Sequence, residues 1–60
     1  MITIGDKVTL MKNNYSPNAF DEYVGKQAVV NLVFWGGQFS VRFDDGKTAD
    51  CDSDEVELTR

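Results

Sequence analysis

Carboxylates make up most of the side chains that could do chemistry here, and they are concentrated near one end of the sequence. Between positions 44 and 57 there are seven acids and a single basic residue, Lys47. The acids are Asp44, Asp45, Asp50, Asp52, Asp54, Glu55 and Glu57. A segment of this charge repels phosphate backbones and attracts basic surfaces, although a solvated acidic face also serves simply to keep a small protein in solution.

Neither catalysis nor metal binding is expected from these acids. The chain has no histidine, which is the commonest general base and a frequent metal ligand. Asp50, Asp52 and Asp54 have the spacing that opens a calcium loop, but Glu55 stands where that loop requires glycine. The paired carboxylates just before Gly46 are typical of a turn. We therefore expect a protein that is not an enzyme, with no catalytic residues, no cofactor and no metal.

Cys51 is the one cysteine, so the chain cannot form an internal disulfide, which suits a reducing cytoplasm. Its acidic neighbours raise the pKa of a thiol and make it less nucleophilic. We expect Cys51 to be a small core residue. A cytoplasmic location is also expected because the sequence has neither a basic start with a long apolar run nor the roughly 20 apolar residues of a membrane helix.

Aromatic side chains are the other candidates for contact with a partner. They are Tyr15, Phe20, Tyr23 and Trp35. Aromatic rings beside carboxylates suit a basic peptide, through stacking, cation–π contacts and ion pairs. We expect Phe20 to cap an open end of the fold and Trp35, next to two glycines, to be exposed. Val29 and Val33 would face outward and could form an apolar contact patch with Trp35.

The elements that position these residues are predicted to be strands. Within residues 25–46, apolar side chains alternate along two stretches, which is typical of strands with one buried face. The predicted inward residues are Ala28, Val30, Leu32, Phe34, Phe39, Val41 and Phe43. Turns are expected at Gly36-Gly37 and at Asp45-Gly46, because such dipeptides supply the positive φ angles of tight hairpins.

Three shorter strands are predicted outside this hairpin. They cover residues 7–12, 47–51 and 56–59, with Val8, Leu10, Ala49, Cys51, Val56 and Leu58 facing inward. The long connection 13–23 contains Ser16-Pro17, a typical helix start, and has room for one helical or 3-10 turn. Ser53 is expected to cap a single turn before the last strand.

Five short strands, a long first loop and a 3-10 turn before the last strand resemble the SH3-like small β-barrels, especially the bacterial KOW-type and Tudor-type versions. The resemblance rests on GDKV at 5–8, GKQAVV at 25–30, VRFDDG at 41–46 and DEVEL at 54–58. It implies an all-β fold, with residues 1–60 forming one five-stranded SH3-like barrel domain. The stretch VGKQAVVNLVF at 24–34 and the acidic ending are also similar to small acidic bacterial SH3-like antirepressors. Such proteins occupy the DNA-reading surface of a repressor.

The favoured hypothesis is a protein-interaction module of the bacterial or phage cytoplasm that binds a basic protein surface. A transcription regulator engaged by nucleic-acid mimicry would be such a partner. The predicted partner-binding residues are Tyr15, Phe20, Tyr23, Trp35, Asp44, Asp45, Asp50, Asp52 and Asp54. One alternative is a KOW-like nucleic-acid-binding domain using Lys7, Lys12, Lys26 and Arg42, which the net charge of −4 disfavours. The other is a small structural subunit of a larger assembly, with Trp35, Val29 and Val33 against a neighbour. The sequence leaves the oligomeric state open.

Overall fold

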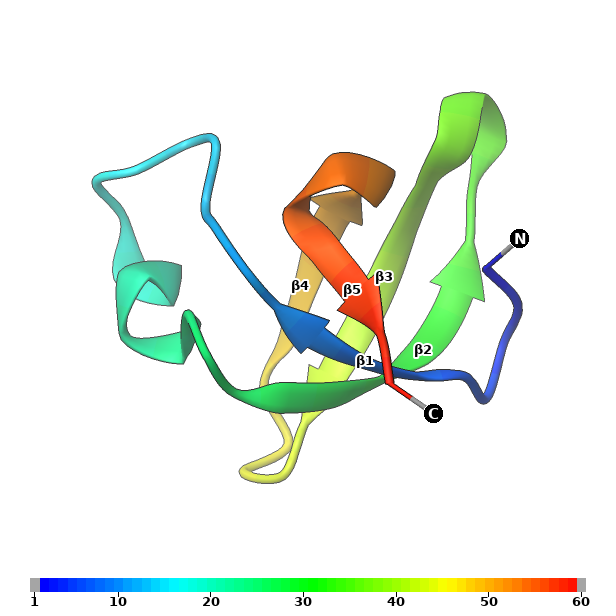
Figure 1. Ribbon diagram of the computed structural model, residues 1–60, viewed down its shortest axis with the longest axis horizontal. Helices are drawn as coiled ribbons and strands as arrows, with labels where there is room; N and C mark the ends of the chain where they lie inside the picture. Colours follow the sequence, from blue (N-terminus) through cyan, green and yellow to red (C-terminus); the bar gives the residue numbers. More distant parts are fainter. Residues whose placement is uncertain (1, 60) are drawn as a thin grey trace.

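The computed structural model describes residues 2–59, which form an all-β fold with short 3-10 helices, written η, and no α-helix within that range (Figure 1). In chain order the elements are β1 (Lys7–Leu10), η1 (Ala19–Tyr23), β2 (Gln27–Val33), η2 (Trp35–Gly37), β3 (Gln38–Phe43), β4 (Thr48–Asp52), η3 (Ser53–Glu55) and β5 (Val56–Leu58). The five predicted strands are therefore confirmed, with ends shifted by one or two residues. Across the described residues, no helix has the length and apolar character needed to cross a bilayer.

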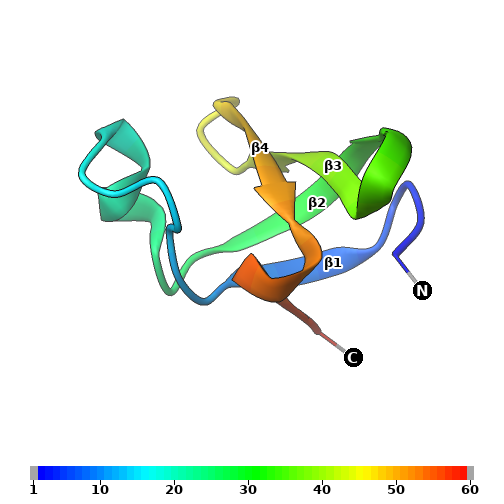
Figure 2. The same cartoon turned by 90° about the horizontal axis from the view of Figure 1, so that it is seen from above.

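The strands form one antiparallel sheet in the order β4-β3-β2-β1-β5. The sheet curves so that β1 and β5 lie in front of β3 and β4, as the two perpendicular views show (Figures 1 and 2). Within residues 2–59 no ladder joins β4 to β5, so both remain edge strands. The small five-stranded fold matches the prediction. A complete barrel would also require hydrogen bonds between β4 and β5, and across residues 2–59 the two strands do not pair.

The core lies between the two halves of the curved sheet. Its buried residues are Val8, Leu10, Ala28, Val30, Phe39, Val41, Phe43, Ala49 and Cys51. All nine were predicted to face inward from the alternation of apolar and polar residues. Phe20, Tyr23, Val56 and Leu58 pack against this core from its margins. The expected role of Phe20 as a partly buried cap is therefore confirmed.

The prediction that Leu32 and Phe34 face inward is wrong, and a β-bulge explains why. Val30 pairs with Val41, but the next pair joins Leu32 to Ser40, so β2 carries one extra residue, Asn31, at this point. Because side chains alternate with a period of two, one extra residue moves the following side chains to the other face. Leu32 is consequently 50% exposed and Phe34 is 43% exposed.

The turns follow the predicted positions, with two corrections to their caps. The 3-10 helix η1 begins at Ala19 rather than after Ser16, and the Asn18 side chain caps it by accepting the Phe20 N–H at 2.8 Å. The turn η3 forms where expected, but Asp52 and not Ser53 occupies its N-cap position. Gly36, Gly37 and Gly46 all have positive φ angles, as the hairpin turns require. Asp45 has a negative φ, so the second turn needs positive φ only at its glycine.

Candidate partner-binding surfaces

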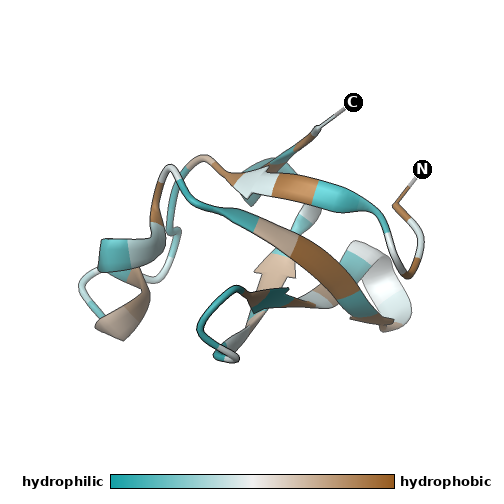
Figure 3. Ribbon diagram, turned by 90° about the horizontal axis from the view of Figure 1, so that it is seen from below, coloured by the Kyte–Doolittle hydropathy of each residue, from teal (hydrophilic) through white to brown (hydrophobic). Residues whose placement is uncertain are grey.

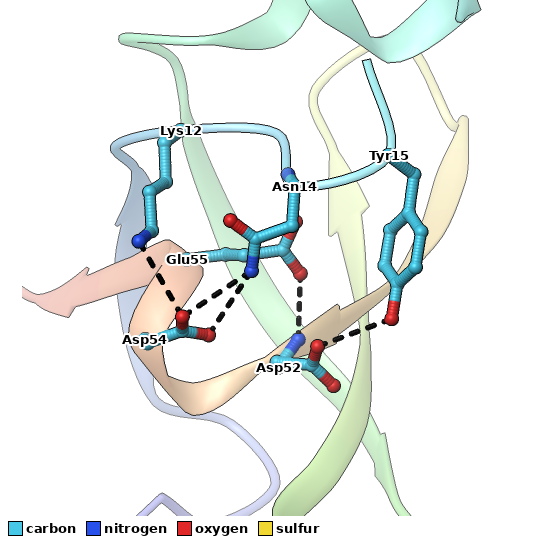
Figure 4. A network of polar contacts seen from close by, with 6 residues as sticks. All are labelled: Lys12, Asn14, Tyr15, Asp52, Asp54 and Glu55. Carbon is cyan, nitrogen blue, oxygen red and sulfur yellow. Dashed lines mark hydrogen bonds and ion pairs between the residues drawn. The ribbon is translucent and has the colours of Figure 1, made fainter.

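Glu55 ties the acidic end of the chain to the long connection between β1 and β2. Its side chain is almost fully buried, at 2% exposure, and its carboxylate accepts the backbone N–H groups of Asn14 and Asp52, each at 2.8 Å (Figure 4). Its carbonyl oxygen accepts the N–H groups of Met11 at 2.7 Å and Lys12 at 3.3 Å. A buried carboxylate requires such donors, so this residue is committed to holding the connection in place.

In the sequence, Glu55 was one of the seven acids between positions 44 and 57 and the residue that breaks the calcium-loop pattern, and its buried position was not predicted. A usable signal was present, because a glutamate three residues after an N-cap such as Asp52 is the pattern of a capping box. The hydrogen bond from Asn14, by contrast, spans 41 residues and has no local signature.

Asp54 and Asp52 also contact this connection, so two predicted partner-binding acids have partners inside the protein (Figure 4). Asp54 accepts the Asn14 side-chain amide at 3.2 and 3.3 Å and pairs with the Lys12 ammonium at 3.4 Å. The bond from Asn14, and then the Lys12 charge, lower the pKa of Asp54. Asp52 accepts the Tyr15 hydroxyl at 3.2 Å, and this bond together with the negative charge raises the pKa of Tyr15.

A first groove lies between the long connection and the edge strand β4, with a cavity volume of about 550 Å³. Its lining residues are Leu10, Asn13, Tyr15, Asn18, Phe20, Gln38, Thr48, Ala49, Asp50 and Cys51. Three predicted partner-binding residues, Tyr15, Phe20 and Asp50, therefore share one hollow. The groove has an apolar floor and a polar rim, which is suited to a peptide rather than to a compact polar metabolite.

A second groove, of about 570 Å³, gathers Tyr23, Asp44 and Asp45 beside the β3–β4 turn. The Tyr23 ring packs on Phe43 with a centroid separation of 4.5 Å, and its hydroxyl donates to the Asp45 carboxylate. Asp45 also accepts the Lys47 N–H at 2.9 Å. The shared bond raises the pKa of Tyr23 and, with the Lys47 bond, lowers the pKa of Asp45.

Trp35 lies apart from the other predicted aromatics, at the tip of the β2–β3 hairpin, opposite the long connection (Figure 1). Trp35 is 95% exposed, which confirms the expectation of exposure, and the three residues before it are each at least 43% exposed. We refer to Leu32, Val33, Phe34 and Trp35 as the apolar tip. Figure 3 shows hydrophobic colour on both sides of a hydrophilic patch near the end of β2. The sequence pointed to Trp35 but missed Leu32 and Phe34, because the bulge has no signal of its own. The prediction that Val33 faces outward with Val29 is wrong for the same reason: after the bulge Val33 pairs with buried Phe39 and lies on that face, and it is exposed only near the end of the hairpin.

Two of the basic residues considered for nucleic-acid binding, Lys7 and Arg42, lie close together in the sheet. On the outer sheet face, Val29 pairs with Lys7 on one side and Arg42 on the other, so the two cations flank one exposed valine. Lys12, by contrast, is engaged by Asp54. This face therefore carries two neighbouring positive charges, opposite in sign to the acidic segment.

Cys51 is buried, as expected of a core residue. Burial, followed by the charges of Glu55, Asp50 and Asp52, raises its pKa to about 12, so the thiol is protonated at neutral pH. Over residues 2–59, no cluster of three or more acidic or cysteine side chains is arranged to hold a metal ion.

Comparison with known proteins supports the fold. No protein-family model matches the chain, and no curated protein matches it by sequence. Among solved structures, the chain is similar to the solution structure of the cyanobacterial cytochrome b6f complex subunit PetP. The TM-score is 0.82 at 20% sequence identity, and the match covers 98% of this chain and 81% of PetP. At 20% identity the likeness shows only that the two proteins share a small all-β fold. The strand order and the core place this chain in the same class, that of small all-β proteins. The KOW-like, Tudor-like and antirepressor resemblances remain predictions.

Proposed function

We propose that this protein is a non-enzymatic interaction module that docks onto a larger protein assembly through its apolar tip. The observation that carries the proposal is the exposure of four large apolar side chains at the end of one hairpin, with Leu32 and Phe34 on one face, Val33 on the other and Trp35 at the turn, 95% exposed. Single exposed apolar residues are ordinary on protein surfaces, but several gathered at the end of one hairpin are typical of an interface.

The energetics favour Trp35 as the main anchor of this interface. Full burial of one large apolar side chain contributes about 1.5–3 kcal/mol, and tryptophan is enriched among the few residues that dominate binding. The adjoining turn holds Trp35 in place, because Phe34 donates its N–H to the Gln38 carbonyl at 2.8 Å, immediately beyond the glycines. A side chain presented on an ordered turn loses little further backbone entropy when it binds.

The fold likeness to PetP supports a role of this general kind, since PetP is a small subunit of a protein complex. Within the proposal, the finer assignment is an SH3-like small barrel that acts in the cytoplasm. Fold likeness alone does not name the assembly, because folds of this type carry many unrelated functions.

The proposal is tested by site-specific photo-crosslinking in the native cell. A photoreactive phenylalanine analogue at position 35 should give one discrete crosslinked protein, whereas the same analogue at Tyr15, which is exposed on the long connection, should not give that product. Equal yields of that product at both positions, or no product at position 35, would refute docking through the tip.

A second candidate function is binding to a basic protein surface through the acidic segment, including nucleic-acid mimicry of a regulator's DNA. Within residues 2–59, no hydrogen bond or ion pair engages the side chains of Asp44 and Asp50, so both carboxylates can face a partner. Charge reversal at Asp44 and Asp50 should weaken such binding steeply in low salt. It should leave the long connection in place, because in the described part of the chain neither side chain contacts it through a hydrogen bond or an ion pair. Salt-insensitive binding would eliminate this candidate.

Nucleic-acid binding is the third candidate, and the row formed by Lys7, Val29 and Arg42 is the surface that favours it. Two cations neutralise few phosphates, and the net charge of −4 opposes approach to a polyanion. A gel shift with mixed RNA and DNA at low salt decides this case, and no shift at micromolar protein would exclude it.

A further inference from the structure

The free edge of β4 offers a second interaction surface, independent of the apolar tip. Successive residues along β3 direct their backbone hydrogen bonds alternately to β2 and to β4. Phe34 donates to the Gln38 carbonyl, which links Gln38 to β2, and Phe43 donates to the Lys47 carbonyl at 2.8 Å, which links Phe43 to the start of β4. Following the register from Phe43, positions 49 and 51 of β4 also bond to β3.

The intervening β4 residues, Thr48 and Asp50, therefore direct their backbone N–H and C=O groups away from the sheet. Both residues are exposed and line the first groove. At Asp52 the outward N–H is already taken by the Glu55 carboxylate, which ends the usable edge. The edge is thus a short window with two donors and two acceptors, bordered by a hollow.

The two faces of this window differ in chemistry. On the inner face, Ala49 and Cys51 are buried and continue into the groove beside Phe20. On the outer face stand the side chains of Thr48 and Asp50, with Asp52 next along the strand. A strand added here would alternate accordingly, with apolar side chains toward Phe20 and basic side chains toward the aspartates.

We propose that the β4 edge binds an extended segment of another protein by strand addition, and that this segment alternates basic and apolar residues. Charge complementarity selects this occupant over a second copy of the chain, because pairing two β4 strands would bring like-charged aspartates together. Main-chain hydrogen bonds to Thr48 and Asp50 supply affinity, and the alternation supplies specificity. The surface does not involve Trp35, so its success or failure is separate from that of the proposed docking through the apolar tip.

The test is an NMR titration of the whole chain with a short, end-blocked peptide of alternating lysine and valine. The amide signals of Thr48 and Asp50 should shift, and their hydrogen exchange should slow. A glutamate–valine peptide, and a lysine–valine peptide N-methylated at alternate residues, should both fail to produce these changes. The first control removes the charge match and the second removes the backbone donors.

Matched variants assign the effect to the edge. Asp50→Lys should weaken binding of the lysine–valine peptide about two- to fivefold and make the glutamate–valine peptide the better ligand. Asp44→Lys makes the same change in net charge on the turn and should alter binding less. Trp35→Ala should leave the titration unchanged. No shift at Thr48 and Asp50 with millimolar peptide, equal binding of the N-methylated peptide, equal effects of the two charge reversals, or peptide-free dimerisation through β4 would each overturn the proposal.

Discussion

The carboxylate of Glu55 accepts the backbone N–H of Asn14 at 2.8 Å, and this bond joins the turn before β5 to a connection 41 residues earlier in the chain. The same carboxylate accepts the Asp52 N–H at 2.8 Å. One side chain thus organises the wall of the first groove and the end of the β4 edge.

Replacing Glu55 with alanine should lower the free energy of unfolding by about 3 kcal/mol, because two charge-assisted hydrogen bonds are lost and two part-buried N–H groups are left without that acceptor. Glu55→Gln keeps one acceptor oxygen and should cost less. Urea denaturation followed by circular dichroism measures both variants. Glu57→Ala, an exposed acid on β5, is the matched control and should change stability by less than about 0.5 kcal/mol. A Glu55→Ala variant as stable as this control would contradict the assigned role.

Tyr15 and Tyr23 should both titrate above the ordinary phenol pKa of 10.0, because each donates its hydroxyl to a carboxylate. A raised pKa in the folded state means that these bonds stabilise the fold below pH 10.0 and lose their effect as the pH rises through the folded-state pKa. Ultraviolet absorbance of the phenolate gives the titration. Asp52→Asn should bring the pKa of Tyr15 down toward 10.0 and leave that of Tyr23 unchanged. If Asp52→Asn shifts neither phenol, the hydrogen bond to Tyr15 is not formed in solution.

Asp54 and Asp45 should show the opposite behaviour in acid. Their pKa values lie below the ordinary 3.8, so the stability they contribute is present above pH 3.8 and is lost as the pH falls through the folded-state values. Carboxyl carbon NMR shifts measured against pH report each residue separately. Asn14→Ala removes the largest cause at Asp54 and should raise its pKa while sparing Asp45. A value for Asp54 that is unchanged by this substitution would contradict the contact.

Leu32 and Leu10 form a matched pair for testing the β-bulge. Leu10 is 3% exposed and Leu32 is 50% exposed, although the alternation in sequence places both inward. Leu10→Ala should cost about 2–5 kcal/mol of unfolding free energy, the range for a buried leucine. Leu32→Ala should cost less than about 1 kcal/mol, because half of its surface is already in water. Equal costs would mean that β2 continues without the extra residue.

The sequence was informative where local chemistry decides the structure. Period-two alternation identified all five strands and the nine core residues, and Gly36, Gly37 and Gly46 marked the turns. It failed at Leu32 and Phe34, because a bulge at Asn31 depends on how two strands fit together and not on either strand alone.

The candidate site shows the same limit. Exposure of Trp35 followed from its place beside the glycines, but the engagement of Asp52 and Asp54 with Asn14 and Tyr15 requires contacts across more than 35 residues. The acids therefore looked uniformly available in sequence, whereas the fold uses several of them to hold the long connection. Charge alone could not separate those acids from Asp44 and Asp50.

The most direct test of the proposed docking uses Trp35 as its own reporter, since it is the only tryptophan in the chain. In the isolated protein its emission should be that of a water-exposed indole, readily quenched by iodide or acrylamide. Once the crosslink at position 35 has identified the partner, the complex is formed again from the protein with its native Trp35 and a variant of the partner that lacks tryptophan. In that complex the emission should shift to the blue and quenching should fall. An unchanged spectrum and unchanged quenching in that complex would contradict docking through the apolar tip.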